Sequence, residues 1–196
     1  MTTLKAERRD MRTKAKKLRR EGYVTGNVFG KSIEGSIPLQ FPKGEIDHLL
    51  KTRNKGSQIM LELDGKQLDV LIKDISYNSM KRQIEEIDFQ ALVSGEKVHS
   101  VAEVVLLNHD KVTTGVLQQN LQEIPFKAVP AALVEKVEID ASRLRVGDVI
   151  KVKDLAIASD PDVDLLADRE EIVVMLLEPH NAPEAEETAE EAEVQK

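Results

Sequence analysis

The chain has 196 residues, of which 41% are hydrophobic, 3% aromatic and 32% charged, and its formal net charge is −7. This length suits one large domain or two small ones, with mainly aliphatic cores. The absence of cysteine excludes disulfides, thiol catalysis and cysteine-ligated zinc, and it fits a reducing, cytoplasmic setting. We expect neither a secretory signal nor a membrane span, because no apolar run approaches the ~18 residues that a span needs.

Charge divides the sequence into three parts. Residues 1–92 carry a net charge of +5, residues 93–178 a net charge of −7, and residues 179–196 a net charge of −5. The positive excess is concentrated in Lys5–Arg20, which holds nine Lys or Arg and two acids. Such a segment, opposite in sign to the whole chain, favours binding of a polyanion, with RNA as the leading candidate. A solvated, lysine-rich helix is the alternative.

The first part predicts strands interrupted by two helices. In chain order we expect a weak strand at 2–6, a helix over 13–21 that Gly22 ends, strands at 24–29 and 37–41, and a helix that begins at Pro42 and ends before Gly56. Asp64-Gly65 then supplies a type I′ turn between strands 58–63 and 66–75. A loop over 76–82 and a strand ending at Phe89 complete a small mixed barrel of about 92 residues.

The second part predicts further strands and little helix. After a short linker at 94–96, we expect strands at 100–106, 127–129, 137–139, 149–152 and 172–177, with a helical turn within 140–148. Residues 115–122 fit either a turn or an irregular strand, and residues 131–134 fit either a helix start or a bend. The run after Pro183 is highly charged and has no apolar stripe, which indicates disorder.

The predicted fold class is therefore mainly β with short helices (α+β). It comprises a six-stranded-type small β-barrel with helices over 1–92, a separate acidic β-rich domain over 93–178, and a disordered acidic tail over 179–196.

Basic side chains recur at helical spacing in the first part. Lys16, Arg19 and Arg20 share one face of the predicted helix, and Arg9 and Arg12 precede it. The planar fork of arginine matches phosphate oxygens and guanine edges, whereas lysine acts as a point charge. This face is therefore a candidate RNA-binding surface.

The aromatic residues predict no stacking platform for single-stranded RNA. Phe41 and Phe89 alternate with polar neighbours, which indicates core positions. Recognition of a folded RNA by shape and groove contacts therefore fits better. The acids Asp74, Glu85, Glu86 and Asp88 lie in this basic half. Either they balance nearby arginines, or they accept hydrogen bonds from the amino groups of bases.

No other constellation indicates catalysis or metal binding. The acids from Asp160 to Glu171 have the spacing of a calcium loop, but Leu165 occupies the position that needs glycine, so an acidic surface loop is expected. The four histidines lack metal-ligand spacing, and no phosphate-binding glycine loop or nucleophile elbow occurs. We expect no enzymatic activity, no cofactor, no metal and no small-molecule substrate.

The order of several motifs resembles one ribosomal family. Lys17-Leu18-Arg19, Gly22, Val24 and Phe29-Gly30 are followed by the hairpin and by Ile87-Asp88-Phe89. The second half continues the likeness with Gly115-Val-Leu, Ile124-Pro, and the run from Asp140 through Leu144, Gly147-Asp148, Ile150 and Val152 to Asp154-Leu155. Together these resemble the bacterial large-subunit ribosomal protein L twenty-five in its long, two-domain form, also called Ctc or general stress protein.

The resemblance implies a structural protein of the large ribosomal subunit. In that family the N-terminal barrel binds 5S ribosomal RNA in the central protuberance, beside neighbouring 5S-binding ribosomal proteins, and the C-terminal module lies on the ribosome surface. The positions that match the family's RNA-contacting motif are Arg9, Arg12, Lys16, Lys17, Arg19, Phe29, Lys73, Glu86 and Asp88. Phe29 stands where the family usually has Tyr, and Glu86 where His is common. The loop at 11–14 is shorter than usual.

Two functional hypotheses follow. The first is a ribosomal RNA-binding protein that is cytoplasmic, associated with ribosomes and monomeric when free. The second is an adaptor that binds tRNA or protein through a barrel like that of anticodon-binding modules. Association with the large subunit at about one copy each would separate them.

Overall fold

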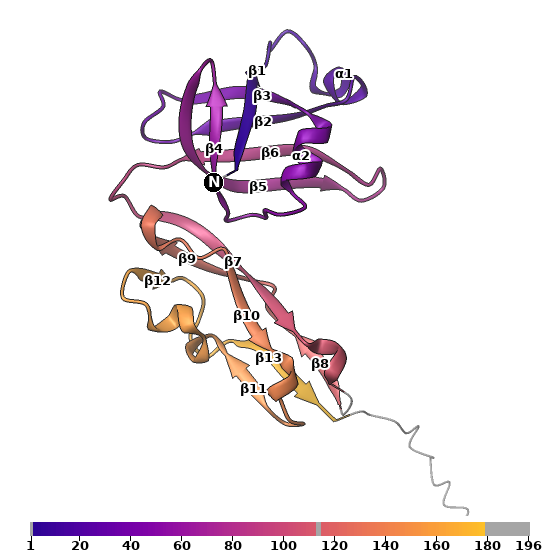
Figure 1. Cartoon of the computed structure of the whole chain (residues 1–196), viewed down its shortest axis with the longest axis vertical. Coiled ribbons are helices and arrows are strands. Elements are labelled where there is room, and N and C mark those ends of the chain that lie inside the picture. The colour runs from indigo at the N-terminus through magenta and orange to yellow at the C-terminus, as the bar shows by residue number, and fades with distance from the viewer. Residues whose placement is uncertain (1, 113–114, 179–196) are drawn as a thin grey trace, which may run out of the picture.

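The computed structural model describes residues 2–112 and 115–178. Within these residues the chain forms a closed barrel followed by a second β-rich body, and Figure 1 shows the two arranged end to end along the long axis of the molecule. The mainly β fold class with short helices is therefore confirmed. The predicted disordered tail, 179–196, lies outside the described residues.

The barrel is built from the first six strands. They are β1 (Thr3–Arg8), β2 (Tyr23–Phe29), β3 (Ser36–Pro42), β4 (Gln58–Leu63), β5 (Lys66–Asn78) and β6 (Gln83–Ala91), in the spatial order β1-β3-β2-β6-β5-β4. Strand β1 closes the barrel because it pairs antiparallel with β3 and parallel with β4. Strand β2 also pairs parallel with β6. The two α-helices are α1 (Ala15–Arg20) and α2 (Lys43–Leu49).

The local predictions for the barrel are largely confirmed. Asp64 and Gly65 have φ angles of 52° and 74°, as a type I′ turn requires. Phe41 and Phe89 are fully buried, and their rings pack edge to face with centroids 5.5 Å apart. The loop predicted over 76–82 is wrong at its start, because β5 continues to Asn78. These residues pair with β6 across a bulge at Ser76/Tyr77, and this long-range pairing overrides the local turn signals.

The second body contains two sheets. The strands are β7 (Val98–Leu107), β8 (Val116–Gln119), β9 (Glu123–Ala128), β10 (Lys136–Asp140), β11 (Val149–Lys151), β12 (Val163–Leu165) and β13 (Ile172–Leu177). Their spatial orders are β10-β7-β9-β12 and β11-β13-β8. Between them lie short 3-10 helices: η1 (His109–Lys111), η2 (Pro130–Ala132), η3 (Ala141–Arg143), η4 (Val152–Asp154) and η5 (Ala156–Ser159). The open choice at 131–134 resolves to the short helical turn of η2, and that at 115–122 to β8.

Each body has its own hydrophobic core. The barrel core gathers inward-facing residues of all six strands with Ile46 and Leu49 of α2. The second core joins both sheets, with Phe126, Ile124 and Val174 fully buried. No helix in residues 2–112 and 115–178 is both long and apolar enough to cross a membrane.

Candidate nucleic-acid interface

Helix α1 rests on the barrel through a single buried side chain. Leu18 is 6% exposed, whereas Lys16, Lys17 and Arg20 on the same helix are exposed. Gly22, with a φ angle of 89°, follows the helix and leads into β2. The sequence therefore folds into a short helix that presents its cations outward. Lys17, Arg19 and Arg20 in the last turn also complement the negative end of the helix dipole.

Arg19 is the basic residue of α1 that is tied to the barrel wall. Its Nε donates to the backbone carbonyl of Glu85 at 3.0 Å, and its Nη1 lies 3.7 Å from a Glu85 carboxylate oxygen. Its Nη2 also donates to Oγ1 of Thr25 at 3.5 Å. These contacts hold the guanidinium in place while its side chain remains 25% exposed.

A groove with a basic lining lies between α1 and the β5–β6 hairpin. We call it the basic groove, and it is lined by Lys16, Arg19, Arg20, Lys81, Gln83 and Glu85. The predicted face of Lys16, Arg19 and Arg20 thus borders a single groove. Lys81 adds a cation from the hairpin, 3.7 Å from the Glu85 carboxylate. Four cations against one acid make this groove suited to a phosphate backbone.

Side chains that face out of the barrel continue from this groove along β2 and β6. We call them the outer stripe: Thr25, which is buried beneath Arg19, with Asn27 and Phe29 of β2, and Glu86, Asp88 and Gln90 of β6. The parallel register pairs Thr25 with Glu86, Asn27 with Asp88 and Phe29 with Gln90. Their inward neighbours, such as Val28 and Phe89, belong to the barrel core.

The two acids of the outer stripe are held by one amide. Asn27 Nδ2 donates to Asp88 Oδ1 at 3.1 Å and to Glu86 Oε1 at 3.5 Å. The remaining lone pairs of these carboxylates can accept hydrogen bonds. The stripe therefore offers fixed acceptors, which suit the exocyclic amino groups of bases, beside the cations of the basic groove.

The segment that precedes α1 is ordered by its own contacts. Arg9 is half-buried, and its Nη2 donates to the Thr13 carbonyl at 3.2 Å. The Asp10 carboxylate accepts from the Arg12 backbone N–H at 2.9 Å, which forms a tight turn. Arg12 is exposed. The short loop at 11–14 is thus a compact turn that leaves the Arg12 side chain facing solvent, and Arg9 braces it.

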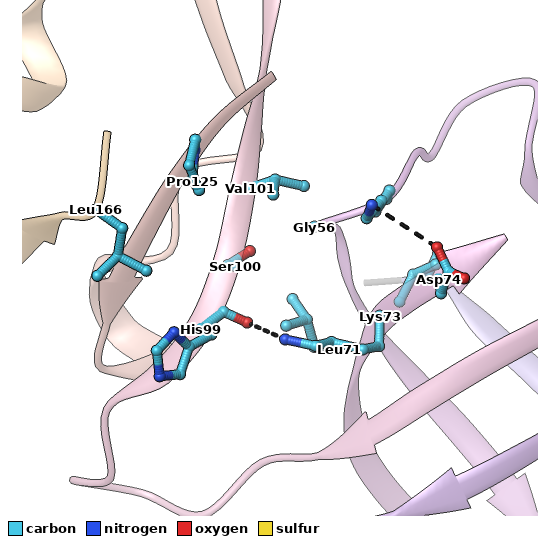
Figure 2. Close-up of a pocket in the computed structure, with 11 residues that line it drawn as sticks. Gly56, Leu71, Lys73, Asp74, His99, Ser100, Val101, Pro125 and Leu166 are labelled. Carbon is cyan, nitrogen blue, oxygen red and sulfur yellow. Dashed lines mark hydrogen bonds and ion pairs between the residues drawn. The ribbon is translucent and has the colours of Figure 1, made fainter. Parts of the chain in front are cut away.

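Lys73 lies apart from the other predicted site residues. It sits in the β5 bulge, and its Nζ donates to the backbone carbonyl of His99 in the second body at 2.8 Å (Figure 2). Burial, and secondarily the nearby Lys55, lower the pKa of this ammonium below its ordinary value. The structure therefore brings Lys16, Arg19 and Arg20 together, places Phe29, Glu86 and Asp88 along the adjoining stripe, and engages Lys73 elsewhere.

Three polar residues at the site, Lys81, Gln83 and Asn27, were not predicted from sequence. Lys81 and Gln83 come from the hairpin, and only the pairing of β5 with β6 brings them to α1. Asn27 had a usable signal, because it alternates with core residues in the predicted strand 24–29 and must face outward. The described part of the chain holds no group of three or more metal-ligating side chains.

Comparison with known proteins gives matches along both bodies. The profile of the Ribosomal L25p family matches residues 4–89, and that of the Ribosomal protein TL5, C-terminal domain, matches residues 97–180. The large ribosomal subunit protein bL25 of Bacillus velezensis is 31% identical over 183 residues, which cover 91% of this chain and 89% of that protein. Its counterpart in Thermosipho africanus is 32% identical over 184 residues, covering 90% of this chain and 83% of that protein.

A third relative, the bL25 protein of Enterococcus faecalis, is 31% identical over 172 residues and covers 87% of this chain and 84% of that protein. These likenesses extend across the barrel, the basic groove and the second body alike. On this ground the chain belongs to the bL25 family of bacterial large-subunit ribosomal proteins, in the long form that carries a TL5-type C-terminal domain.

Proposed function

We propose that this protein is a non-enzymatic constituent of the large ribosomal subunit that binds 5S ribosomal RNA in the central protuberance through its barrel, residues 1–92. In this role it is cytoplasmic and ribosome-associated, with neighbouring 5S-binding ribosomal proteins around it. The observation that carries the proposal is the adjacency of the basic groove to the fixed acceptors of the outer stripe. Family membership supports the same function.

The basic groove and the outer stripe differ in chemistry and therefore contact different parts of the RNA. Lys16, Arg20 and Lys81 are exposed cations and contact phosphates, which position the RNA without reading its sequence. Arg19, Glu86 and Asp88 are held in place by neighbours and contact base edges. Residues 93–178 carry a net charge of −7, so they are repelled by RNA and face protein or solvent.

Titration of the intact chain with 5S RNA at several salt concentrations tests the proposal. With roughly five phosphate contacts, the logarithm of affinity should fall against the logarithm of salt with a slope of about −3 to −5. An unrelated RNA duplex of equal length serves as the competitor. Equal affinity for both RNAs, or binding that is independent of salt, would refute the proposal.

The adaptor hypothesis is tested by stoichiometry. A ribosomal constituent co-sediments with purified large subunits at about one copy per subunit and stays bound at salt concentrations that strip loosely associated proteins. An adaptor that binds tRNA or another protein is absent from that fraction. Family membership favours the ribosomal constituent.

A further inference from the structure

The barrel and the second body meet through several polar contacts from the segment after α2. Arg53 Nη1 lies 2.8 Å from both carboxylate oxygens of Glu135, and the two side chains are only 28% and 32% exposed. Asn54 donates to the Glu103 carboxylate. Lys55 Nζ lies 3.5 Å from Glu123 Oε2 of the second body. Three consecutive residues of the barrel thus each contact an acid of the second body.

Strand β5 adds an apolar and a polar contact to the same junction. Its neighbours Val70 and Ile72 belong to the barrel core, so Leu71 between them points out of the barrel. Leu71 is nevertheless fully buried, and it lines one cavity with Val101 and Leu166 of the second body (Figure 2). An outward-facing leucine on a barrel is buried only if another part of the chain covers it. The Lys73 hydrogen bond to His99 lies beside it.

At Gly56 the backbone of the barrel closely approaches the backbone of the second body. Gly56 is buried with a φ angle of 86°, and a Cβ built on it would lie 2.1 Å from the Val101 carbonyl oxygen of β7. Real Cβ atoms do not approach a backbone oxygen so closely, so any other residue here would push β7 away. The absence of a side chain at Gly56 is therefore a requirement of the contact between the bodies as well as of the backbone conformation.

We propose that this junction locks the two bodies into one fixed orientation. The residues that form it are Arg53–Gly56, Leu71 and Lys73 of the barrel and His99–Val101, Glu103, Glu123 and Glu135 of the second body. We call it the interbody brace. The chain then behaves as a single rigid rod in solution, although its bodies are connected by a short turn at 94–96. Without such contacts, relative motion would be the default for two domains in one chain. The brace also gives Lys73 a structural role, because the hydrogen bond from its ammonium to the His99 carbonyl is part of the junction.

Distance measurement between the bodies tests the brace. Because the chain has no cysteine, Ser32→Cys in the barrel and Ser159→Cys in η5 give two unique, exposed sites for spin labels. Double electron–electron resonance should give a single narrow distance distribution for the otherwise unaltered chain. A broad distribution would overturn the proposal.

Gly56→Ala should replace that narrow peak with a broad distribution. Gly35→Ala is the matched control, because Gly35 has a similar φ angle of 80°, but no atom of the described residues beyond Gly35 and its two chain neighbours lies within 4 Å of a Cβ added there. This control carries the backbone strain without the clash and keeps the narrow peak. A folded Gly56→Ala protein, verified by circular dichroism, that also keeps the narrow peak contradicts the brace.

A charge swap tests the interbody brace even if Gly56→Ala does not fold. Arg53→Glu and Glu135→Arg should each broaden the distribution, and the double variant should restore the narrow peak. Lys153→Glu, which disrupts the pair with Glu170 inside the second body, should leave the peak unchanged. Single reversals that leave the peak narrow, or a double variant that stays broad, would overturn the proposal.

Discussion

Arg19 of α1 and Glu85 of β6 are joined through two different groups of the glutamate. The guanidinium donates to the Glu85 backbone carbonyl at 3.0 Å and also lies 3.7 Å from its carboxylate. A planar fork can reach both groups at once, whereas a lysine ammonium on a flexible stem cannot hold that geometry. The contact fixes α1 against the hairpin and holds Arg19 in place on the wall of the basic groove.

Arg19→Ala should weaken binding to 5S RNA by about 1–3 kcal/mol, since it removes a preoriented donor set at a base edge. It should also lower the midpoint of thermal unfolding, because the carbonyl of Glu85 loses a partner. Fluorescence titration and scanning calorimetry measure the two effects. Arg19→Lys should recover little of either, because lysine cannot form the same two contacts.

Arg20→Ala is the matched control on the next residue. Arg20 is exposed and has no hydrogen-bond or ion-pair partner among the described residues. Its loss should lower affinity evenly across RNA sequences and reduce the salt slope by about 1 without changing thermal stability. Equal behaviour of the two variants would show that Arg19 contacts only phosphate.

Asp88→Asn separates the two interpretations of the acids on the outer stripe. If Asp88 accepts hydrogen bonds from base amines, loss of the carboxylate weakens binding by about 1–3 kcal/mol and relaxes RNA sequence preference. If the acid only balances nearby arginines, removing a negative charge strengthens binding, and does so most at low salt. We expect the weakening, because Asn27 holds Asp88 in position. Titrations with 5S RNA and a base-substituted RNA give the sign directly.

The barrel was more predictable than the site. Alternation and the Asp64-Gly65 turn act within a few residues, so the hairpin, the strands and the burial of Phe41 and Phe89 followed from local sequence. The parallel pairing of β2 with β6 joins residues about 60 positions apart, and no local pattern specifies its register. That register alone places Asn27 beside Asp88.

The hydrogen-bond partner of Lys73 could not be predicted from the local sequence. The position of Lys73 on the hairpin was predicted correctly, but its partner depends on how the second body packs against β5. The same packing buries Leu71, which points out of the barrel. A contact between two bodies of one chain produces no hydrophobic periodicity in either segment, so the local sequence does not predict it.

Phe29→Tyr should tighten RNA binding by about 0.5–1.5 kcal/mol, because it adds one hydrogen-bonding hydroxyl to a half-buried ring on the outer stripe. The fold should be unaffected. Phe41→Tyr is the matched control: its ring is fully buried against Phe89, so an added hydroxyl there lowers stability and gives no gain in affinity. Titration and thermal unfolding of both variants distinguish these effects. Unchanged affinity in Phe29→Tyr would remove Phe29 from the interface.

Acid should destabilise the second body partly through Glu170. Hydrogen bonds from Lys151 and Lys153 lower the pKa of this carboxyl to about 2. Since its pKa in the unfolded chain is higher, the unfolded state binds more protons in the range between, and stability falls as the pH drops through it. Glu170→Gln should therefore be less stable than the parent at neutral pH, and the difference should close as the pH falls from about 5 toward 2.

Denaturant unfolding of the parent and Glu170→Gln at several pH values measures this closing difference. The side chain of Glu170 is 59% exposed, so added salt should reduce the difference as well. Glu171→Gln is the control, because that neighbouring exposed acid has no side-chain ion pair among the residues that the structure describes. A difference for Glu170→Gln that persists at low pH would assign its effect to packing instead of charge.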